Sequence, residues 1–289
     1  MRWLMLLPAI SFGQKLDAVQ RDIESIVKSV QGTFAVAFES LDGKGQLLLN
    51  EKVMFHAAST MKTPVVIEVY RQSKEGRFSL DDSLVVRNAF KSIVDGSSYQ
   101  LDPKDDSDDS MYKKLGDKLS IRELIRQMIT VSSNLATNLL MDLVEAGKVT
   151  VTMRSLGASD IEVLRGVEDG KAFEKGLNNR TSALDLLTIM KAISRGEAVD
   201  SAASKEILEI LLNQKFNELI PALLPPDVRV AHKTGNITGV EHDSGIVLLP
   251  DGRRYVLVIL SKDLKDVDAG KKAIALVSRR IYDFVMEGK

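Results

Sequence analysis

A chain of 289 residues with 44% hydrophobic and 27% charged side chains has an ordinary globular composition, long enough for a large core or two lobes sharing one. The formal net charge of −1 excludes a broad positive field, so we expect no nucleic-acid partner. Cysteine is absent, which excludes disulfides and thiolate chemistry. The three histidines lack the close spacing of a zinc hydrolase, so we expect neither a metal nor a cofactor.

The first 13 residues have the pattern of a secretory signal peptide. Arg2 precedes a short apolar run, and the small residues Ser11 and Gly13 stand where a signal peptidase requires them. The run is too short to cross a bilayer. We therefore expect an exported, periplasmic protein with no stable membrane span.

Residues 14–50 predict one helix and a hairpin. Residues Gln14–Gln31 place apolar side chains at helical spacing. Thr33–Leu41 alternates in the manner of a strand, and a turn at residues 42–45 leads into a second strand, Gln46–Asn50.

From Ser59 to about Leu212 the apolar periodicity is helical. The clearest helices are expected at Thr63–Gln72, Ser120–Ile129, Leu135–Ala146, Val149–Leu156 and Ala183–Ser194. The acidic stretch at residues 102–109 lacks the glycine and the terminal glutamate of a calcium loop, so we expect a solvated surface loop there.

Three strands and a helix close the chain. The strands are expected at Val228–Thr234, Ser244–Leu249 and Tyr255–Leu260, and the helix at Ala269–Met286. The predicted fold class is α/β (α+β), with an antiparallel sheet of about five strands, flanking terminal helices and a large all-helical insertion. Residues 14–58 and 213–289 would form the α/β lobe and residues 59–212 the helical lobe of one catalytic unit.

The pattern Ser-x-x-Lys is a weak sign of a serine nucleophile, and it occurs at three places. These are Ser25/Lys28, Ser59/Lys62 and Ser110/Lys113. Only Ser59 follows small residues and opens a strongly apolar helix, so we expect the other two matches to be accidental. A serine at a helix start lies near free N–H groups, and a lysine three residues later lies on the same helix face. An N-cap serine followed by a surface lysine is the structural alternative.

Two later triplets are equally ambiguous when each is taken alone. Ser132-Ser133-Asn134 stands between two predicted helices, where it could either cap a helix or direct a hydroxyl and an amide into a cleft. Lys233-Thr234-Gly235 lies on a predicted strand, where the lysine could hold a carboxylate and the glycine could let a substrate lie flat.

Taken together and in this order, the three motifs resemble those of the penicillin-recognising serine enzymes. Over essentially its whole length, the chain is similar to the class A β-lactamases. The resemblance implies Ser59 as nucleophile, Lys62 as proton acceptor and Ser132 as proton shuttle. It implies substrate binding by another group of residues: Asn134, Lys233, Thr234, Gly235 and the backbone N–H of Asn236, which would form an oxyanion hole with that of Ser59.

The chain departs from this family pattern at two places. The middle residue of the second motif is Ser133, where the hydrolytic lactamases usually have aspartate. The loop glutamate that activates the deacylating water follows an arginine after one residue in the family, whereas here two residues separate Arg165 from Glu168. We take Glu168 as the deacylation base, with an ordinary loop carboxylate as the alternative.

The leading functional hypothesis is hydrolysis of β-lactam amides through an acyl-enzyme on Ser59. The same site could serve a D-alanyl-D-alanine peptidase or esterase, a penicillin-binding protein that deacylates slowly, or a sensor that is acylated once. A triad of Ser59, His242 and Asp243 is less favoured, because no serine lies in a Gly-x-Ser-x-Gly elbow. The expected partner is a small β-lactam or peptidoglycan-like molecule, and we expect a monomer.

Overall fold

The computed structural model describes residues 12–287, so most of the predicted signal peptide lies outside the described residues. The first helix, α1, spans Phe12–Lys28 and begins two residues earlier than its periodicity predicted. Within the described range, no helix is both long and apolar enough to cross a membrane.

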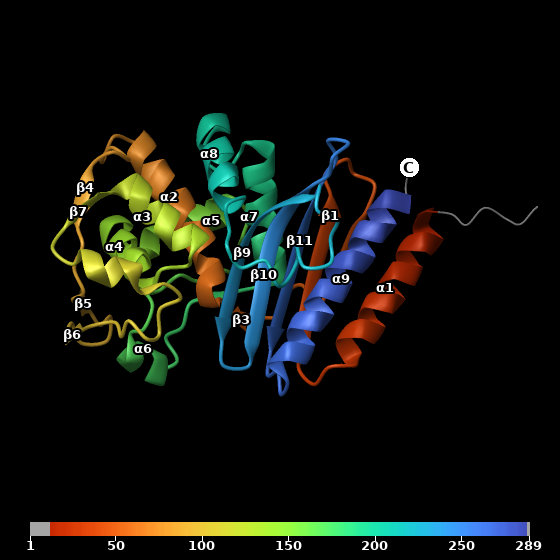
Figure 1. The fold of residues 1–289 in the computed structure, drawn as a ribbon, viewed down its shortest axis with the longest axis horizontal. Coiled ribbons are helices and arrows are strands. Elements are labelled where there is room, and N and C mark those ends of the chain that lie inside the picture. Colours follow the sequence, from red (N-terminus) through yellow and green to blue (C-terminus); the bar gives the residue numbers. More distant parts are fainter. Residues whose placement is uncertain (1–11, 288–289) are drawn as a thin grey trace, which may run out of the picture.

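A five-stranded antiparallel sheet forms the centre of the molecule (Figure 1). Its strand order is β2-β1-β11-β10-β9, so the first and last parts of the chain share one sheet. The five strands are β1 (Thr33–Ser40), β2 (Gln46–Leu49), β9 (Arg229–Ile237), β10 (Val240–Leu248) and β11 (Arg254–Lys262). In the pairing of β9 with β10, Lys233 lies opposite Ser244.

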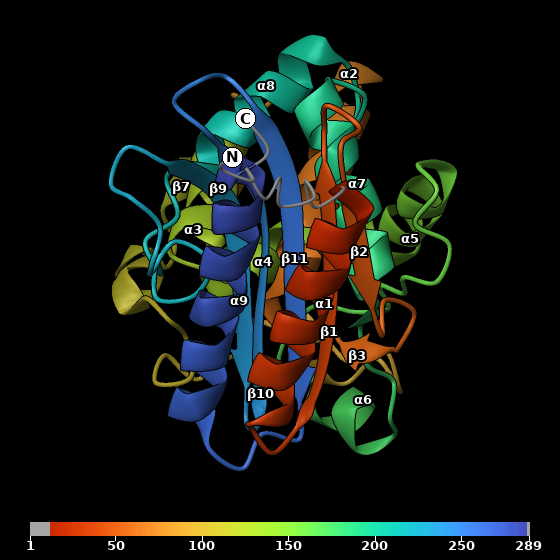
Figure 2. The same cartoon turned by 90° about the vertical axis from the view of Figure 1, so that its right-hand side faces the viewer.

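Two terminal helices cover one face of this sheet. Helix α9 (Val267–Glu287) runs beside α1, and Figure 2 shows both in front of the strands. Successive strand residues point to opposite faces, so Val36 and Phe38 pack under these helices, while Ala35 and Ala37 face the other core. An ion pair between Arg280 and Asp22, at 2.8 Å, ties the two helices together.

The insertion between β2 and β9 is mostly helical, as predicted. Its helices are η1 (Ala58–Met61), α2 (Lys62–Lys74), η2 (Asp109–Lys114), α3 (Ile121–Thr130), α4 (Asn134–Val144), α5 (Ala146–Ser155), α6 (Gly170–Glu174), α7 (Ala183–Arg195) and α8 (Ser201–Leu211). Short two-stranded ladders, which the periodicity did not predict, occur in and beside it. They pair β3 (Phe55–His56) with β8 (Arg180–Thr181), β4 (Ser83–Val85) with β7 (Lys118–Ser120), and β5 (Phe90–Lys91) with β6 (Ser98–Tyr99).

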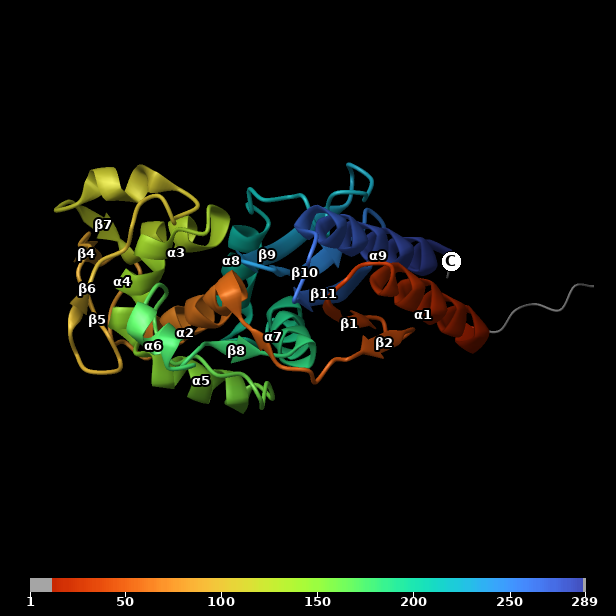
Figure 3. The ribbon, with the colours of Figure 1, turned by 90° about the horizontal axis from the view of Figure 1, so that it is seen from below.

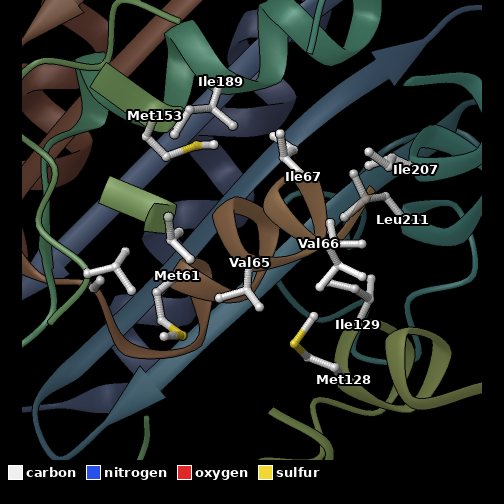
Figure 4. Close-up of a cluster of buried hydrophobic side chains, with 14 of the residues drawn as sticks. Met61, Val65, Val66, Ile67, Met128, Ile129, Met153, Ile189, Ile207 and Leu211 are labelled. Atoms are coloured by element: carbon white, nitrogen blue, oxygen red, sulfur yellow. The ribbon is translucent and has the colours of Figure 1, made fainter. Parts of the chain in front are cut away.

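Helix α2 lies in the middle of the helical layer, between the sheet and helices α3–α5 (Figure 3). It is buried on nearly all sides, which explains why its sequence lacks a polar stripe. Figure 4 shows the apolar side chains of η1 and α2 among those of their neighbours: Met61, Val65, Val66, Ile67, Met128, Ile129, Met153, Ile189, Ile207 and Leu211. This packing fixes the position of the helix start that carries Ser59 and Lys62.

Candidate active site

The three motifs of the sequence converge on one cleft. Ser59 lies in η1, Lys62 is the first residue of α2, and the triplet 132–134 forms the turn between α3 and α4. Lys233 lies on strand β9, which packs against η1. The cleft has a volume of about 490 Å³, and its lining includes Ser59, Asn134, Glu168 and Asn236.

Lys62 is fully buried, and its ammonium group is directed at the 132–134 turn. Its Nζ donates to the backbone O of Ser132 at 2.7 Å, to Ser132 Oγ at 3.1 Å and to Asn134 Oδ1 at 2.8 Å. Burial lowers the pKa of Lys62 to about 7, although the nearby carboxylates of Asp106 and Glu168 act in the opposite direction. A lysine with this pKa is partly neutral at pH 7 and can accept a proton.

The other two Ser-x-x-Lys lysines have no such environment. Lys28 and Lys113 keep 74% and 73% of their side chains exposed and pair with nearby acidic residues on the same helix. Their surroundings agree with the sequence-based expectation that both matches are accidental.

Lys233 approaches the same hydroxyl from the sheet side. Its Nζ donates to Ser132 Oγ at 3.0 Å and to the backbone O of Thr234 at 2.9 Å. Burial lowers the pKa of Lys233 well below its usual range, and the positive charge of Lys62 lowers it further. The Ser132 hydroxyl therefore bridges two buried amines, which is a suitable position for a group that relays a proton.

Gly235 allows the sheet to approach the nucleophile closely. A Cβ atom added to this glycine would lie 2.9 Å from the backbone nitrogens of both Ser59 and Thr60. Strand β9 and helix η1 could not keep this separation with any larger residue. Asn236, the next residue, is exposed and lines the cleft beside Ser59.

Glu168 reaches the cleft in spite of the extra residue before it. Its Oε1 accepts a hydrogen bond from Asn134 Nδ2 at 2.6 Å. Burial raises the pKa of Glu168, and the hydrogen bond from Asn134 opposes this effect. Asn134 therefore joins Lys62 to Glu168, with its oxygen accepting from the amine and its nitrogen donating to the carboxylate.

The loop that carries Glu168 is held by residues that sequence reasoning missed. Asn138, on α4, accepts from the backbone N of Val167 at 2.7 Å and donates to its O at 3.0 Å. The extra residue fits because it is Gly166, where a Cβ atom would lie 2.3 Å from Asn138 Oδ1. An asparagine one turn beyond Asn134 was the available signal, because residues four apart share a helix face.

The two ends of this loop are also tied to each other. Arg165 donates to the backbone O of Leu177 at 2.9 Å and to Asn178 Oδ1 at 3.0 Å. Asn179 accepts from the backbone N of Leu164 at 2.8 Å and donates to the O of Arg165 at 2.9 Å. Asn178 and Asn179 therefore close the neck of the loop.

Three residues at the site have a left-handed backbone although none of them is glycine. They are Ala58 (φ 45°), Ser132 (φ 59°) and Glu168 (φ 60°). Such conformations cost free energy and persist where the surrounding structure enforces them, as it does at many functional sites. They adjoin or carry the predicted nucleophile, shuttle and deacylation base.

The alternative Ser-His-Asp triad does not form. His242 is fully buried and its Nε2 contacts the backbone O of His56 at 2.9 Å, while burial lowers its pKa to about 4. Asp243 contacts His232 Nδ1 at 2.9 Å. The ring nitrogens of both histidines contact other groups, so neither histidine is available as a base for Ser59.

The acidic loop is only partly the solvated segment that was expected. Asp102 and Asp105 are exposed, but Asp106 is half-buried against the 132–134 turn. Its carboxylate accepts hydrogen bonds from the backbone N of Asn134, at 2.9 Å, and of Leu135, at 3.1 Å. Within residues 12–287, no group of three or more His, Asp or Glu side chains is arranged to hold a metal ion.

Comparison with known proteins decides the family, because a model of the "Beta-lactamase enzyme family" matches residues 18–285. The chain belongs to this family. The predicted family, fold class and enzyme type are thereby confirmed.

Individual relatives agree with this assignment. A β-lactamase from Bacteroides uniformis is 26% identical over 93% of this chain and 92% of its own length. Among solved structures, a β-lactamase from Sphaerobacter thermophilus has a TM-score of 0.77 and 27% identity, with 92% of this chain and 95% of that chain covered. A protein called PBP-A has a TM-score of 0.79 and 28% identity, with 94% and 97% covered.

Proposed function

We propose that this enzyme hydrolyses the cyclic amide of β-lactams in two steps, through an ester on Ser59. The observation that carries the proposal is the position of Ser132 Oγ, which lies 3.1 Å from Lys62 Nζ and 3.0 Å from Lys233 Nζ. In this arrangement, a proton that Lys62 takes from Ser59 could pass through the Ser132 hydroxyl to the leaving nitrogen.

In the first step, neutral Lys62 takes the proton of Ser59 as Oγ bonds to the lactam carbonyl carbon. The C–N bond then breaks, and the nitrogen receives a proton from the Ser132 hydroxyl. Protonated Lys62 then returns a proton to Ser132. The backbone N–H groups of Ser59 and Asn236 stabilise the oxyanion. Lys233, together with Thr234, binds the substrate carboxylate, whose charge favours the protonated lysine.

In the second step, a water molecule attacks the ester carbonyl carbon. Glu168 accepts one proton of the water, the bond to Ser59 Oγ breaks, and the serine recovers its proton. The hydrogen bond between Glu168 and Asn134 supports this role, because the carboxylate would then lie beside the substrate amide that Asn134 would bind. One water molecule is consumed for each ring opened.

The decisive experiment follows product formation from a chromogenic cephalosporin over many equivalents of enzyme. We expect sustained turnover that Ser59→Ala abolishes, with a matched substitution at Ser110, in the accidental motif, having no effect. A single stoichiometric burst with a stable adduct on Ser59 would identify a penicillin-binding protein or sensor instead. The absence of both reaction and adduct would refute the proposal.

We also propose that the protein is exported to the periplasm and acts there as a monomer. The support is the signal-like pattern of residues 1–13 and an active site built within one chain. Elements of both predicted lobes, 14–58 with 213–289 and 59–212, line this site, so they would act as one catalytic unit. N-terminal sequencing of periplasmic protein and sedimentation of the purified enzyme test these points.

A further inference from the structure

Asp106 covers the start of α4 from outside the helix. The first N–H groups of a helix have no intrahelical acceptor. Here Asn134 N lies 2.9 Å from each carboxylate oxygen of Asp106, and Leu135 N lies 3.1 Å from Oδ2. The third group, Ala136 N, donates a hydrogen bond to Ser133 Oγ at 3.3 Å. The cap of α4 is thus shared between the local serine and a distant aspartate.

The negative charge at this helix end comes from the loop because the turn itself has none. Ser133, the local cap, is uncharged, and its Oγ lies 3.5 Å from Asp106 Oδ2. Tyr112, on η2, donates to the same oxygen at 3.1 Å. A carboxylate in this position is favoured by the helix dipole and by several donors at once.

The turn that Asp106 holds carries the chemistry of the site. Ser132 contacts both buried lysines, and Asn134 joins Lys62 to Glu168. A shift of this turn would move the hydroxyl and the amide together. Displacements of about 1 Å in such a constellation cost roughly a hundredfold in rate.

The charge of Asp106 also acts on its titratable neighbours. It favours the protonated form of Lys62, raising the pKa against the effect of burial, and it raises the pKa of Glu168 and of Tyr112. Other charged groups that act on this cluster are Lys233 and Asp243 in the sheet and Asp102 and Asp105 in the acidic loop. Asp106 is the acidic-loop carboxylate that bonds directly to the turn.

We propose that Asp106 is a positioning residue, which fixes the Ser132–Asn134 turn from the acidic loop and substitutes for a carboxylate absent at position 133. The proposal rests on the proposed function, because the turn matters through acylation of Ser59. Its structural half, the capping of α4 by Asp106, is measurable without any substrate.

The test compares Asp106→Asn with Asp109→Asn, which removes the same charge from an exposed position in the neighbouring helical turn. Amide hydrogen exchange at Asn134 and Leu135 reports the cap. In Asp106→Asn a neutral amide replaces the carboxylate that accepts from these N–H groups, so the cap is weaker. We therefore expect amide exchange at Asn134 and Leu135 to accelerate about tenfold or more. Exchange should stay unchanged in Asp109→Asn.

Acylation by a chromogenic cephalosporin supplies the second readout. We expect Asp106→Asn to slow the burst by roughly a hundredfold. Because its charge raises the pKa of Lys62, removing it should also move the acidic limb of the burst rate to lower pH. A merely structural loss would lower the rate at every pH and leave the limb in place.

A carboxylate restored to the turn should rescue the variant. We expect Ser133→Asp combined with Asp106→Asn to recover most of the burst rate and the slow exchange. Ser133→Asp alone should impair the enzyme, since it places two carboxylates together. If Asp106→Asn does not fold, a comparison of the double variant with Ser133→Asp alone tests the same proposal.

The outcomes separate the two proposals. If wild-type enzyme forms no adduct, the proposed function fails, while the exchange measurement still tests the cap. If wild-type enzyme is acylated and Asp106→Asn matches Asp109→Asn in exchange, burst rate and limb position, the positioning role is overturned. Failure of Ser133→Asp to rescue Asp106→Asn would also overturn the substitution argument.

Discussion

The ammonium groups of Lys62 and Lys233 meet at one hydroxyl, that of Ser132, at 3.1 and 3.0 Å. Two positive charges buried on either side of one hydroxyl repel each other, so these two lysines bind their protons less tightly than exposed lysines do. One amine of the pair is thereby available as a base near neutral pH. We expect this relationship to set the pH dependence of acylation.

We expect the burst rate to rise with pH through about 7, where Lys62 loses its proton, and then to level off. Since the folded pKa is lowered from 10.5, the neutral base is present above this limb and lost as the pH falls through it. The limb belongs to the coupled pair of amines. Stopped-flow acylation between pH 5 and 10 measures it.

Lys62→Arg should abolish this limb and slow acylation by about 10²–10⁴-fold, because a guanidinium stays charged. Lys113→Arg, in an exposed copy of the motif, is the matched control and should be unchanged. A wild-type limb near pH 10, or rapid acylation by Lys62→Arg, would remove Lys62 from the role of base.

Glu168→Gln should leave the burst intact and stop turnover, because the amide keeps the shape of the side chain but cannot take a proton from water. We expect a loss of about 10²–10⁴-fold in the steady-state rate. Since burial raises the pKa of Glu168, the wild-type deacylation rate should fall as the pH is lowered, and this loss should begin at a higher pH than for an unperturbed glutamate.

Glu174→Gln is the control for this change, because Glu174 is exposed on α6 in the same loop. Mass spectrometry of the acylated protein distinguishes the steps: the Glu168 variant should accumulate the ester on Ser59. Unchanged turnover in that variant would show that another group activates the water.

The sheet and its terminal helices were largely predictable, because apolar periodicity marks elements that bury one face. Strand β10 shows where this fails: it begins at Val240, four residues before its predicted start. The missed residues include His242 and Asp243, polar side chains that read as a loop. They are buried in the sheet because each has a partner, the backbone O of His56 and the ring of His232.

The site shows a similar division. Motifs of known order predicted Ser59, Lys62 and Lys233 as site residues, because each motif is local in sequence. The contacts of Asn138 with Val167 and of Asp106 with Asn134 join segments 28 or 29 residues apart. A local pattern can place Asn138 on the helix face of Asn134, but it does not identify the distant partner of either residue, which only the folded chain reveals.

Removing the support of the Glu168 loop should affect deacylation more than acylation. Asn138→Ala deletes two hydrogen bonds to Val167, at 2.7 and 3.0 Å, and leaves the half-buried backbone N of Val167 without its acceptor, while the O of Val167 keeps a hydrogen bond from the Tyr99 hydroxyl. We expect turnover to fall about tenfold or more, while the burst changes little, and the free energy of unfolding to drop by about 1–3 kcal/mol. Asn213→Ala, at an exposed asparagine after α8, is the control. Equal losses in burst and turnover would argue against a selective role for this contact.

The contact between strand β9 and η1 should tolerate no side chain at position 235. In Gly235→Ala the new methyl group would lie 2.9 Å from the backbone nitrogens of Ser59 and Thr60, so strand and nucleophile must separate. We expect acylation to slow by about 10–100-fold and the free energy of unfolding to fall by about 1–3 kcal/mol. Gly147→Ala, where an added Cβ meets no described atom within 4 Å, should leave activity unchanged and stabilise α5 by about 0.5–1 kcal/mol. Burst kinetics and urea unfolding of both variants test this, and wild-type acylation by Gly235→Ala would show that the close approach is not needed for the reaction.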